Sequence, residues 1–258
     1  MDLTETAMTA LVARTLDSVT ETGGMGLITA PQGAGKSVSV MMAARDRRHV
    51  KRVVLVEGLS SPRALYRHVA MTLGIDAPTQ AGAADLVTAV SAAVKRHDYL
   101  LVLDQCQRLK RPNQFDQVAC LVDLLPALVL VGPPALRSRV QAHEECVSLC
   151  TVPLQLARGV EMAELHGALG GQFSEAWLEH VWEASAGCWR RIHAAVAAAQ
   201  RAMRRTGRDT RELGAEDAEK LVGAIMLNPS PVTRVTPKAT AAQPKVVETN
   251  GQLQLAAG

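Results

Sequence analysis

Short apolar runs alternate with amphipathic segments over the first 156 residues of the chain. Five of these runs have the character of strands: GLITA, RVVLVEG, YLLVLD, ALVLVG and CVSLCTVPL, at residues 26–30, 52–58, 99–104, 127–132 and 146–154. Strands that are apolar throughout, rather than at every second position, are typical of a parallel sheet that is covered on both faces. The pattern therefore predicts a three-layer α/β fold with a parallel sheet.

The segments between these runs have helical patterns and would supply the outer layers. We expect helices at 37–48, 61–74, 84–97 and 134–143, with one more before the first strand. Ser60 or Ser61 can cap the helix at 61–74, where Pro62 suits the first turn. Helices between successive apolar strands are the connections that a parallel sheet requires.

Composition narrows the class of protein only a little. With 258 residues, of which 48% are hydrophobic, the chain is long enough to bury a full core. Its apolar runs stay below the roughly 18 residues of a membrane span, and MDLTETAMTA contains no visible secretory signal. Five cysteines without a CxxC pair favour reduced thiols in a cytosolic chain. The net charge of +3 is too small to indicate a polyanionic partner by itself.

The segment APQGAGKSV, residues 30–38, follows the first strand and has the pattern of a phosphate-binding loop. Its glycines let successive backbone N–H groups converge on a phosphate, its lysine suits the β and γ oxygens, and its serine offers a hydroxyl to Mg²⁺. The N-terminus of the next helix also favours anions. We therefore predict ATP and Mg²⁺ as cofactors, with contacts from Ala30, Pro31, Gln32, Gly33, Ala34, Gly35, Lys36, Ser37 and Val38. Ala30 stands where the usual pattern has its first glycine.

A second motif, YLLVLDQCQRL, ends the third predicted strand with an acid. The end of a buried parallel strand would place Asp104 beside the phosphate loop, where it can join Ser37 in the magnesium shell. The next position usually holds the carboxylate that orients or deprotonates the attacking water. Gln105 forms hydrogen bonds but takes no proton at neutral pH. We therefore expect an ATPase that binds nucleotide normally and either hydrolyses it slowly or depends on a group supplied elsewhere.

The strands stop after about Leu156. Four helical segments follow, at 159–171, 174–185, 188–205 and 214–227, and a helical appendix of this size behind a nucleotide-binding sheet is expected to be a small lid. From residue 228 the chain is rich in Pro, Thr and Ala without a sustained period, which predicts disorder. We divide the chain into a nucleotide-binding domain (1–156), a lid (157–227) and a tail (228–258).

Several blocks of the sequence resemble those of the AAA+ ATPases related to the phage Mu B transposition protein. They are TALVARTLDSVTETGGMGLITAPQGAGKS, YLLVLDQCQRL and LVLVGPPALRSRV. The same blocks occur in TniB and TnsC-type transposon ATPases and in the more distant ExeA secretion ATPases. SAGCWRRIHAAVAAA resembles the lid motif of this group, in which an arginine reaches the γ-phosphate, and the match falls on Arg190. The resemblance covers roughly residues 5 to 225.

The resemblance implies an ATP-dependent protein of the bacterial host cytoplasm that assembles as a helical filament or ring on duplex DNA. It would mark target DNA and activate a transposase. Two positions depart from the group: Pro133 replaces the polar sensor that often follows the fourth strand, and no arginine stands just before the fifth strand. Arg137 and Arg139, on the preceding helix, are our candidates for an arginine finger that acts on a neighbouring copy.

Basic side chains supply candidate DNA contacts. Aromatic residues make up only 3% of the chain, which disfavours a stacking platform for single strands. Contact with the backbone of a duplex needs neither aromatic residues nor base readout. Side chains expected on the loop side of the sheet are Arg63, Arg67, Arg108, Lys110 and Arg111, for which a solvated surface is the alternative. The densest basic run, RDRRHVKR at 45–52, fits a solvated edge better.

Two other functions remain open at this stage. One is a regulatory or secretion-linked ATPase, similar to the ExeA group, that acts through protein partners without DNA. The other is a scaffold that binds nucleotide but does not hydrolyse it, which Gln105 keeps possible. A transposition protein should be retained on random duplex DNA, whereas the first alternative should not. Release of phosphate from ATP distinguishes an ATPase from the second alternative.

Overall fold

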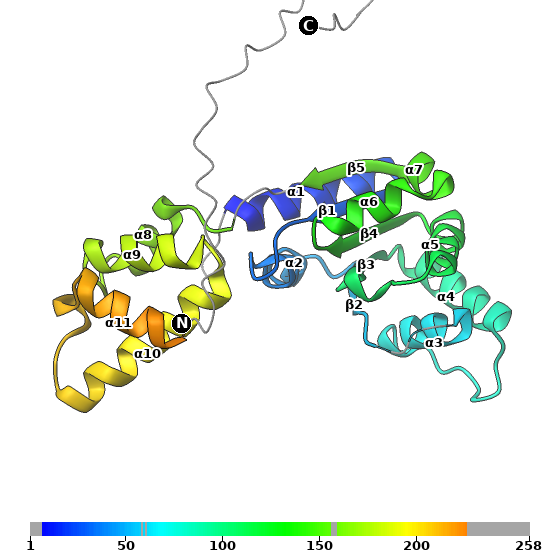
Figure 1. The fold of residues 1–258 in the computed structure, drawn as a ribbon. Helices are drawn as coiled ribbons and strands as arrows, with labels where there is room; N and C mark the ends of the chain where they lie inside the picture. Colours follow the sequence, from blue (N-terminus) through cyan, green and yellow to red (C-terminus); the bar gives the residue numbers. More distant parts are fainter. Residues whose placement is uncertain (1–6, 58, 60, 156–158, 226–258) are drawn as a thin grey trace, which may run out of the picture. The chain divides into compact units, whose positions relative to one another are not determined.

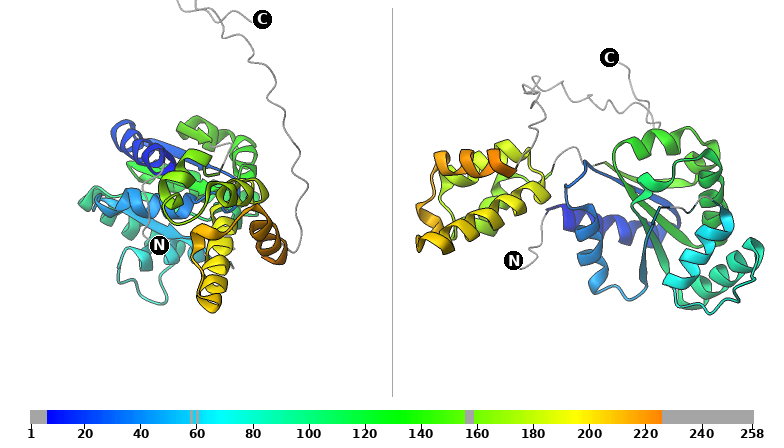
Figure 2. Two further views of the ribbon diagram at one scale, coloured as in Figure 1. Left: turned by 90° about the vertical axis from the view of Figure 1, so that its left-hand side faces the viewer. Right: turned by 60° about the horizontal axis from the view of Figure 1, so that its bottom comes forward.

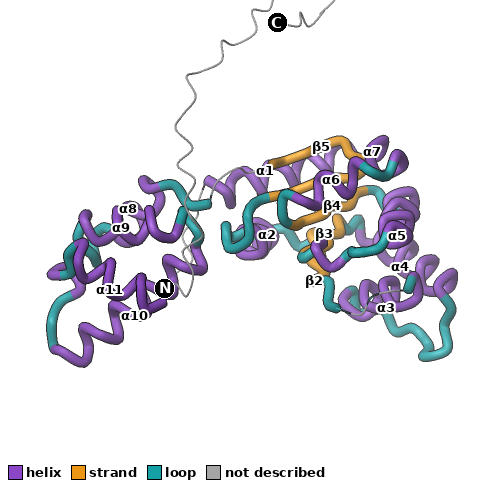
Figure 3. Tube along the Cα trace, viewed as in Figure 1, coloured by secondary structure: helices purple, strands orange, loops and turns teal. Residues whose placement is uncertain are grey.

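A computed structural model of the chain describes residues 7–57, Leu59, 61–155 and 159–225 (Figure 1). Helices and strands alternate up to the fifth strand, and only helices follow it (Figure 3). The predicted tail, 228–258, lies outside the described residues, as does the predicted boundary between domain and lid at 156–157. Within the described part of the chain, no helix combines the length and apolarity needed to cross a membrane.

The sheet has five parallel strands in the order β2-β3-β4-β1-β5. They are β1 (Gly24–Thr29), β2 (Val50–Val54), β3 (Leu100–Asp104), β4 (Ala127–Gly132) and β5 (Cys150–Gln155). Every residue of β3 and β4 is buried, as their uninterrupted apolar sequences predict. The parallel sheet of the predicted three-layer fold is thereby confirmed.

Two apolar clusters cover the two faces of the sheet. On one face, α1 (Ala7–Thr22) and α2 (Lys36–Arg45) pack on strand residues such as Ile28 and Val102. On the other face, Leu27 and Leu103 meet the helices α3 (Pro62–Thr72), α4 (Ala83–His97), α5 (Pro112–Leu124), α6 (Ala135–Gln141) and α7 (Glu144–Leu149). The right-hand view of Figure 2 shows the sheet between these two layers. Since α2 starts directly after the phosphate loop, the first layer sets the position of that loop.

Helix α3 begins as its sequence predicts. The Ser61 hydroxyl accepts a hydrogen bond from the backbone N–H of Ala64 at 3.2 Å, and Pro62 occupies the first turn. A hydroxyl at this position satisfies one of the backbone donors that the first turn leaves open. Of the two serines proposed as the cap, Ser61 is therefore the one that acts.

Two segments differ from the sequence-based prediction. Helix α5, with Phe115 and Leu121 buried on its core face, was not predicted at all. Residues 146–149, predicted as the start of the fifth strand, instead form the end of helix α7. Glu144 and Glu145 in the first turn stabilise that helix, because acidic side chains offset the positive end of its dipole. A short apolar run does not distinguish a strand from a buried helix by periodicity.

The last four helices surround a core of their own. They are α8 (Met162–Leu169), α9 (Glu175–Ser185), α10 (Trp189–Thr206) and α11 (Ala215–Ile225). Phe173 and Trp177 stack at the centre of this core with ring centroids 4.2 Å apart, and Trp177 is fully buried. The four predicted helical segments are all present.

Candidate functional site

The loop between β1 and α2 depends on two glycines for its path. Gly33 and Gly35 have φ values of 81° and 102°, in the left-handed region where a side chain is strained. Gly35 is also the residue that caps α2. The two glycines of the predicted motif are therefore needed by the path of the chain itself, and they direct it into the N-terminus of α2.

Lys36, the first residue of α2, folds back over this loop. Its ammonium group donates hydrogen bonds to the carbonyl oxygens of Ala30 and Pro31, at 2.7 and 2.8 Å. Burial lowers the pKa of Lys36, the negative charge of Asp104 opposes that shift, and the positive charge of Arg190 adds to it. A phosphate oxygen bound in the loop would take over donors that now serve the two carbonyls.

Asp104 closes β3 with a carboxylate that is almost completely buried, its side chain being 2% exposed. Oδ1 accepts the backbone N–H of Gln105 at 2.7 Å. Oδ2 accepts two hydrogen bonds from the guanidinium of Arg52, from Nε at 2.9 Å and from Nη2 at 2.5 Å. Sequence reasoning missed Arg52, because it belongs to the basic run that was assigned to a solvated edge.

Gln105 is held by a second polar network. Its backbone has φ 64° and ψ 40°, an uncommon left-handed conformation for a residue other than glycine. Its side-chain Oε1 accepts a hydrogen bond from Nε of Arg108 at 3.1 Å, and Nη1 of Arg108 lies 3.2 Å from a carboxylate oxygen of Glu57. The amide oxygen of Gln105 is therefore engaged, which leaves its NH₂ group, a donor only, for a ligand.

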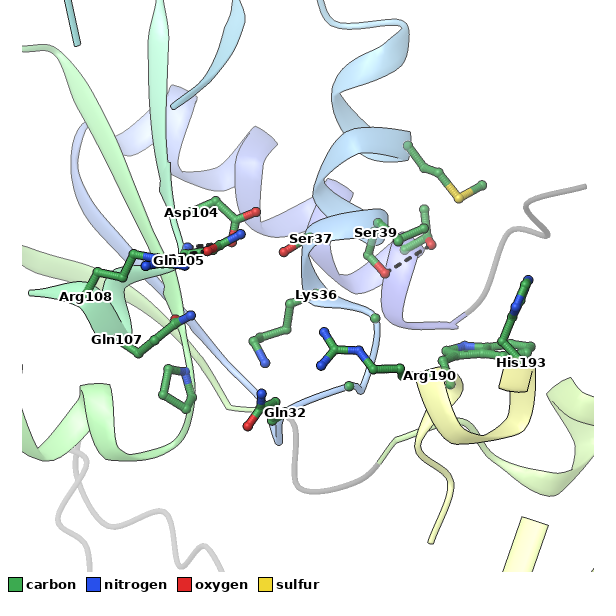
Figure 4. Close-up of a pocket in the computed structure, with 17 residues that line it drawn as sticks. Gln32, Lys36, Ser37, Ser39, Asp104, Gln105, Gln107, Arg108, Arg190 and His193 are labelled. Atoms are coloured by element: carbon green, nitrogen blue, oxygen red, sulfur yellow. Dashed lines mark hydrogen bonds between the residues drawn. The ribbon is translucent and has the colours of Figure 1, made fainter. Parts of the chain in front are cut away.

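Lys36, Asp104, Gln105 and Arg108 line one pocket of about 660 Å³ (Figure 4). Figure 4 shows Ser37 beside Asp104, both above Lys36, with Arg190 extending from α10 toward Lys36. Predicted site residues in the lining are Gln32, Gly33, Gly35, Lys36, Ser37, Val38, Asp104, Gln105 and Arg190. Ala30 and Pro31 act behind it through their carbonyl groups, and Ala34 is buried.

The pocket also contains residues that were not predicted for nucleotide binding. They are Thr9, Ser39, Met42, Gln107, Arg108, Pro133, Trp189 and His193. Met42 and Trp189 give the pocket an apolar part beside its charged part, which suits a ligand with both a ring system and phosphates. The sequence contains a hint of this part, since Trp189 directly precedes Arg190 in the lid motif.

The donor set fits Mg²⁺ bound together with phosphates. Magnesium is usually held by one or two carboxylates plus the oxygens of a substrate, rather than by a cage of protein ligands. Asp104 and the Ser37 hydroxyl provide neighbouring oxygens in the pocket lining. The described residues contain no cluster of three or more His, Cys, Asp or Glu side chains that could hold a metal alone.

The remaining basic candidates lie outside this pocket, and several have intramolecular contacts. Arg63 and Arg67 donate hydrogen bonds to carbonyl groups of residues 78–81, so they brace the connection between α3 and α4. Arg139 donates to the carbonyl of Leu109 at 3.0 Å and thereby ties α6 to the segment after β3. Arg137 is exposed on the same helix. Lys110 and Arg111 are exposed just before α5.

The basic run at 45–52 is not simply a solvated edge. The guanidinium of Arg47 donates to both carboxylate oxygens of Asp17, each at 2.7 Å, and so joins the end of α2 to α1. Arg52 reaches Asp104. The side chains of these two arginines are 27% and 26% exposed. The run therefore supplies two internal ion pairs.

Comparison with known proteins agrees with this geometry. A family model described as an AAA domain matches residues 19–140. The ORC2 protein of Aeropyrum pernix, in ADPNP and ADP complexes, aligns over 83% of this chain with 17% identity and a TM-score of 0.62. The Aeropyrum pernix ORC1 protein in complex with DNA aligns over 85% with 19% identity and a TM-score of 0.63. None of the curated proteins compared with the sequence matches it.

A third structure is similar in extent as well as in fold. Domain III of the replication initiation protein DnaA from Thermotoga maritima aligns over 88% of this chain and 95% of its own length, with 14% identity and a TM-score of 0.57. The chain spans only 66% and 64% of the two ORC structures. At these identities the likeness concerns the fold alone.

Proposed function

We propose that the protein is a slow ATPase that binds duplex DNA in the presence of ATP, assembles on it and activates a transposase. The observation that carries the nucleotide part is the pocket itself. Lys36, Ser37 and Asp104 come from two segments some seventy residues apart, and Arg190 comes from a third, yet all line one cavity. Their chemistry fits a polyphosphate with Mg²⁺, and no other assignment uses all four.

Each of these residues has a defined task in the proposed reaction. The loop N–H groups and Lys36 bind the phosphates, and Arg190 neutralises charge on the terminal one. Bound Mg²⁺ would draw electron density from the phosphoryl oxygens. Ser37 and Asp104 would hold it, directly or through water. A neighbouring copy could add Arg137 or Arg139 to the same phosphate.

Slow turnover follows from the state of Gln105. With Oε1 bonded to Arg108, the group that faces a water molecule is an NH₂ donor, which orients the water but removes no proton. General-base assistance typically contributes about 10²–10⁴ in rate. We infer that ATP acts chiefly as a ligand that keeps an assembly together. Because hydrolysis is slow, the assembly persists before hydrolysis dissolves it. If the rate of hydrolysis were zero, the protein would be a scaffold that binds ATP without hydrolysing it, and the same contact of Gln105 supports that alternative.

The DNA part rests on basic side chains near the pocket, on the relatives and on the sequence resemblance. Arg108 lines the pocket. Lys110 and Arg111 come shortly after Arg108 in the sequence and are exposed. One similar structure is an ORC1 protein in complex with DNA. The blocks shared with the Mu B, TniB and TnsC group favour transposition over replication initiation. They also favour a filament or ring of copies in the bacterial cytoplasm.

The test is retention on random-sequence duplex DNA with ATP, with ADP and without nucleotide, over a series of salt concentrations. We expect retention only with ATP and a steep fall with salt, because each neutralised phosphate contributes about −0.9 to the slope of log affinity against log salt. Retention that ignores both nucleotide and salt would favour the protein-partner alternative.

A matched pair of variants locates the DNA contacts. The double variant Lys110→Ala/Arg111→Ala removes two charges after the carboxyl end of β3, and Lys95→Ala/Arg96→Ala removes two before its amino end. All four side chains are exposed. We expect the first variant to lower the salt slope by about 2 and the second to leave it unchanged. Equal effects of the two would mean that only net charge matters.

A further inference from the structure

The buried carboxylate that is proposed to serve the metal already has a cation. Arg52 bonds Oδ2 of Asp104 through two nitrogen atoms, and the Gln105 backbone N–H takes Oδ1. Both oxygens are thus engaged before any ligand enters. Among the residues assigned to the site from sequence, none explains this arrangement, and the proposed reaction does not use Arg52.

The strand register dictates the contact between these two residues. In the β2–β3 pair, Val54 lies opposite Asp104 and Arg52 lies opposite Val102. Side chains two residues apart on a strand point to the same face, so Arg52 shares with Asp104 the face that α2 covers. Val50, the next residue of β2 on that face, packs in the cluster under α1 and α2. Arg52 therefore cannot turn away from Asp104 without leaving this layer.

The energetics of burial explain why the pair forms. A carboxylate with 2% exposure loses most of its hydration and needs an opposite charge and hydrogen-bond donors. The guanidinium provides both, in charge-assisted bonds that are stronger than neutral ones. Arg52 itself remains 26% exposed, so its side chain has access to solvent.

We propose that Arg52 is the resident counter-cation of Asp104 and that it competes with Mg²⁺ for this carboxylate. A guanidinium and a divalent cation repel each other, and Oδ2 cannot serve both at full strength. The protein therefore tolerates the metal-free state, and it gains Mg²⁺ only as Arg52 releases Oδ2. Arg52 thereby sets the metal affinity of the nucleotide-bound site. This inference rests on the nucleotide site proposed above.

The experiment measures metal binding rather than turnover. Mn²⁺ is titrated into the full chain with an equimolar β,γ-imido analogue of ATP, and free Mn²⁺ is followed by electron paramagnetic resonance. Arg52→Met keeps the length of the side chain and removes its charge. We expect it to lower the Mn²⁺ dissociation constant about tenfold or more, the value of a lost charge-assisted competitor. Arg52→Lys, which keeps the charge but offers a less suitable donor geometry, should lower it by less.

Lys51→Met is the matched control. Lys51 precedes Arg52 on β2 and points to the other face, where its ammonium lies 4.5 Å from the centre of the Tyr99 ring. Its replacement removes the same charge at a similar place in the sequence without touching Asp104, and should leave the Mn²⁺ dissociation constant unchanged.

The outcomes separate this inference from the proposed function. If the unsubstituted protein fails to bind the ATP analogue, the nucleotide site is wrong. If it binds the analogue but Arg52→Met has an unchanged or higher Mn²⁺ dissociation constant, only the competition is wrong. Should Arg52→Met not fold, Arg52→Lys decides the matter: a lower constant supports the competition, and an unchanged one overturns it.

Discussion

The phosphate loop and the end of β3 face the same pocket, but they are built in different ways. The loop gets its properties from a contiguous segment, in which two glycines with positive φ direct the backbone and Lys36 bonds carbonyls five and six residues away. The end of β3 depends on partners far along the chain. Asp104 meets an arginine 52 residues before it, and the network of Gln105 reaches Glu57.

The difference shows where local sequence suffices. A loop whose function is carried by backbone N–H groups needs a particular run of residues, so its motif is visible in one stretch. A buried carboxylate needs a counter-charge, and any strand in register can supply it. The first region is therefore recognisable without a structure, whereas the environment of the second requires the strand pairing.

We expect the largest effect from a substitution in the loop between β1 and α2. Lys36→Ala removes a cation that makes several charge-assisted bonds, each worth about 1.5–3 kcal/mol. It should abolish the binding of a fluorescent ATP analogue in an equilibrium titration. Ala30→Gly, which restores the usual glycine and keeps the carbonyl that Lys36 uses, should bind nearly as well as the unsubstituted protein. Unchanged affinity in Lys36→Ala would refute the phosphate site.

The next effect tests the β3 side directly. Gln105→Glu introduces the proton acceptor that the position lacks, and general-base assistance is worth about 10²–10⁴ in rate. We expect single-turnover hydrolysis with DNA present to accelerate by about a hundredfold, and ATP-dependent assemblies to leave DNA sooner. If the unsubstituted protein already turns over rapidly and the variant is no faster, Gln105 positions water adequately or another residue is the base.

We expect a smaller effect when the contact between Arg108 and Gln105 is removed. Arg108→Met removes the donor that holds the Gln105 amide but leaves the phosphate loop intact. Single-turnover hydrolysis should slow by about threefold to tenfold, since the loss of one hydrogen bond costs about 0.5–1.5 kcal/mol, while ATP affinity stays constant. Lys110→Met, measured without DNA, is the control. A loss of ATP affinity in Arg108→Met would instead place its guanidinium on the phosphates.

The smallest effect concerns an ion pair outside the pocket. Arg47 lowers the pKa of Asp17 from its ordinary 3.8, chiefly through their hydrogen bonds. A carboxylate with a lowered pKa stabilises the fold above its unfolded pKa, and this contribution is lost as the pH falls through the folded pKa. Since the Asp17 side chain is 47% exposed, Asp17→Asn should cost only about 0.5–1 kcal/mol of unfolding free energy.

Urea unfolding between pH 3 and pH 7 measures that difference. It should be constant well above pH 3.8 and should shrink below it. The carboxylate of Asp17 is far more exposed than that of Asp104, 47% against 2%, so water competes with its contact and the contribution should be small. A difference that grew on acidification would contradict the assigned cause of the pKa shift.

Much of the fold is predictable because its strands are buried on both faces. Residues 100–103 and 127–132 are apolar without interruption, and the structure confirms a strand at each place. Helix α5 escaped prediction because Pro112 and the polar residues after it resemble a loop. The strand predicted to begin at Cys146 starts at Cys150 instead, because the acidic residues before it initiate a helix.

The site shows the same division. The pattern of residues 30–38 and the acid at the end of β3 identify the pocket, since each motif carries its chemistry locally. Arg52 could not be assigned, because a basic run on a solvated edge and one that supplies buried ion pairs have the same composition. Only the register of β2 against β3 separates the two. The roles of Arg190 and the basic DNA candidates remain predictions.

The two edge strands of the described sheet also limit how copies of the protein can associate. β2 forms one edge and carries two adjacent basic residues, Lys51 and Arg52, and β5 forms the other and contains Pro153, which has no backbone N–H to offer. Charge and proline at sheet edges oppose the addition of a further strand from another molecule. If copies assemble on DNA as proposed, these edges would keep them from merging into one continuous sheet. They would join through helices and loops instead, in contacts that can be undone when the nucleotide is spent.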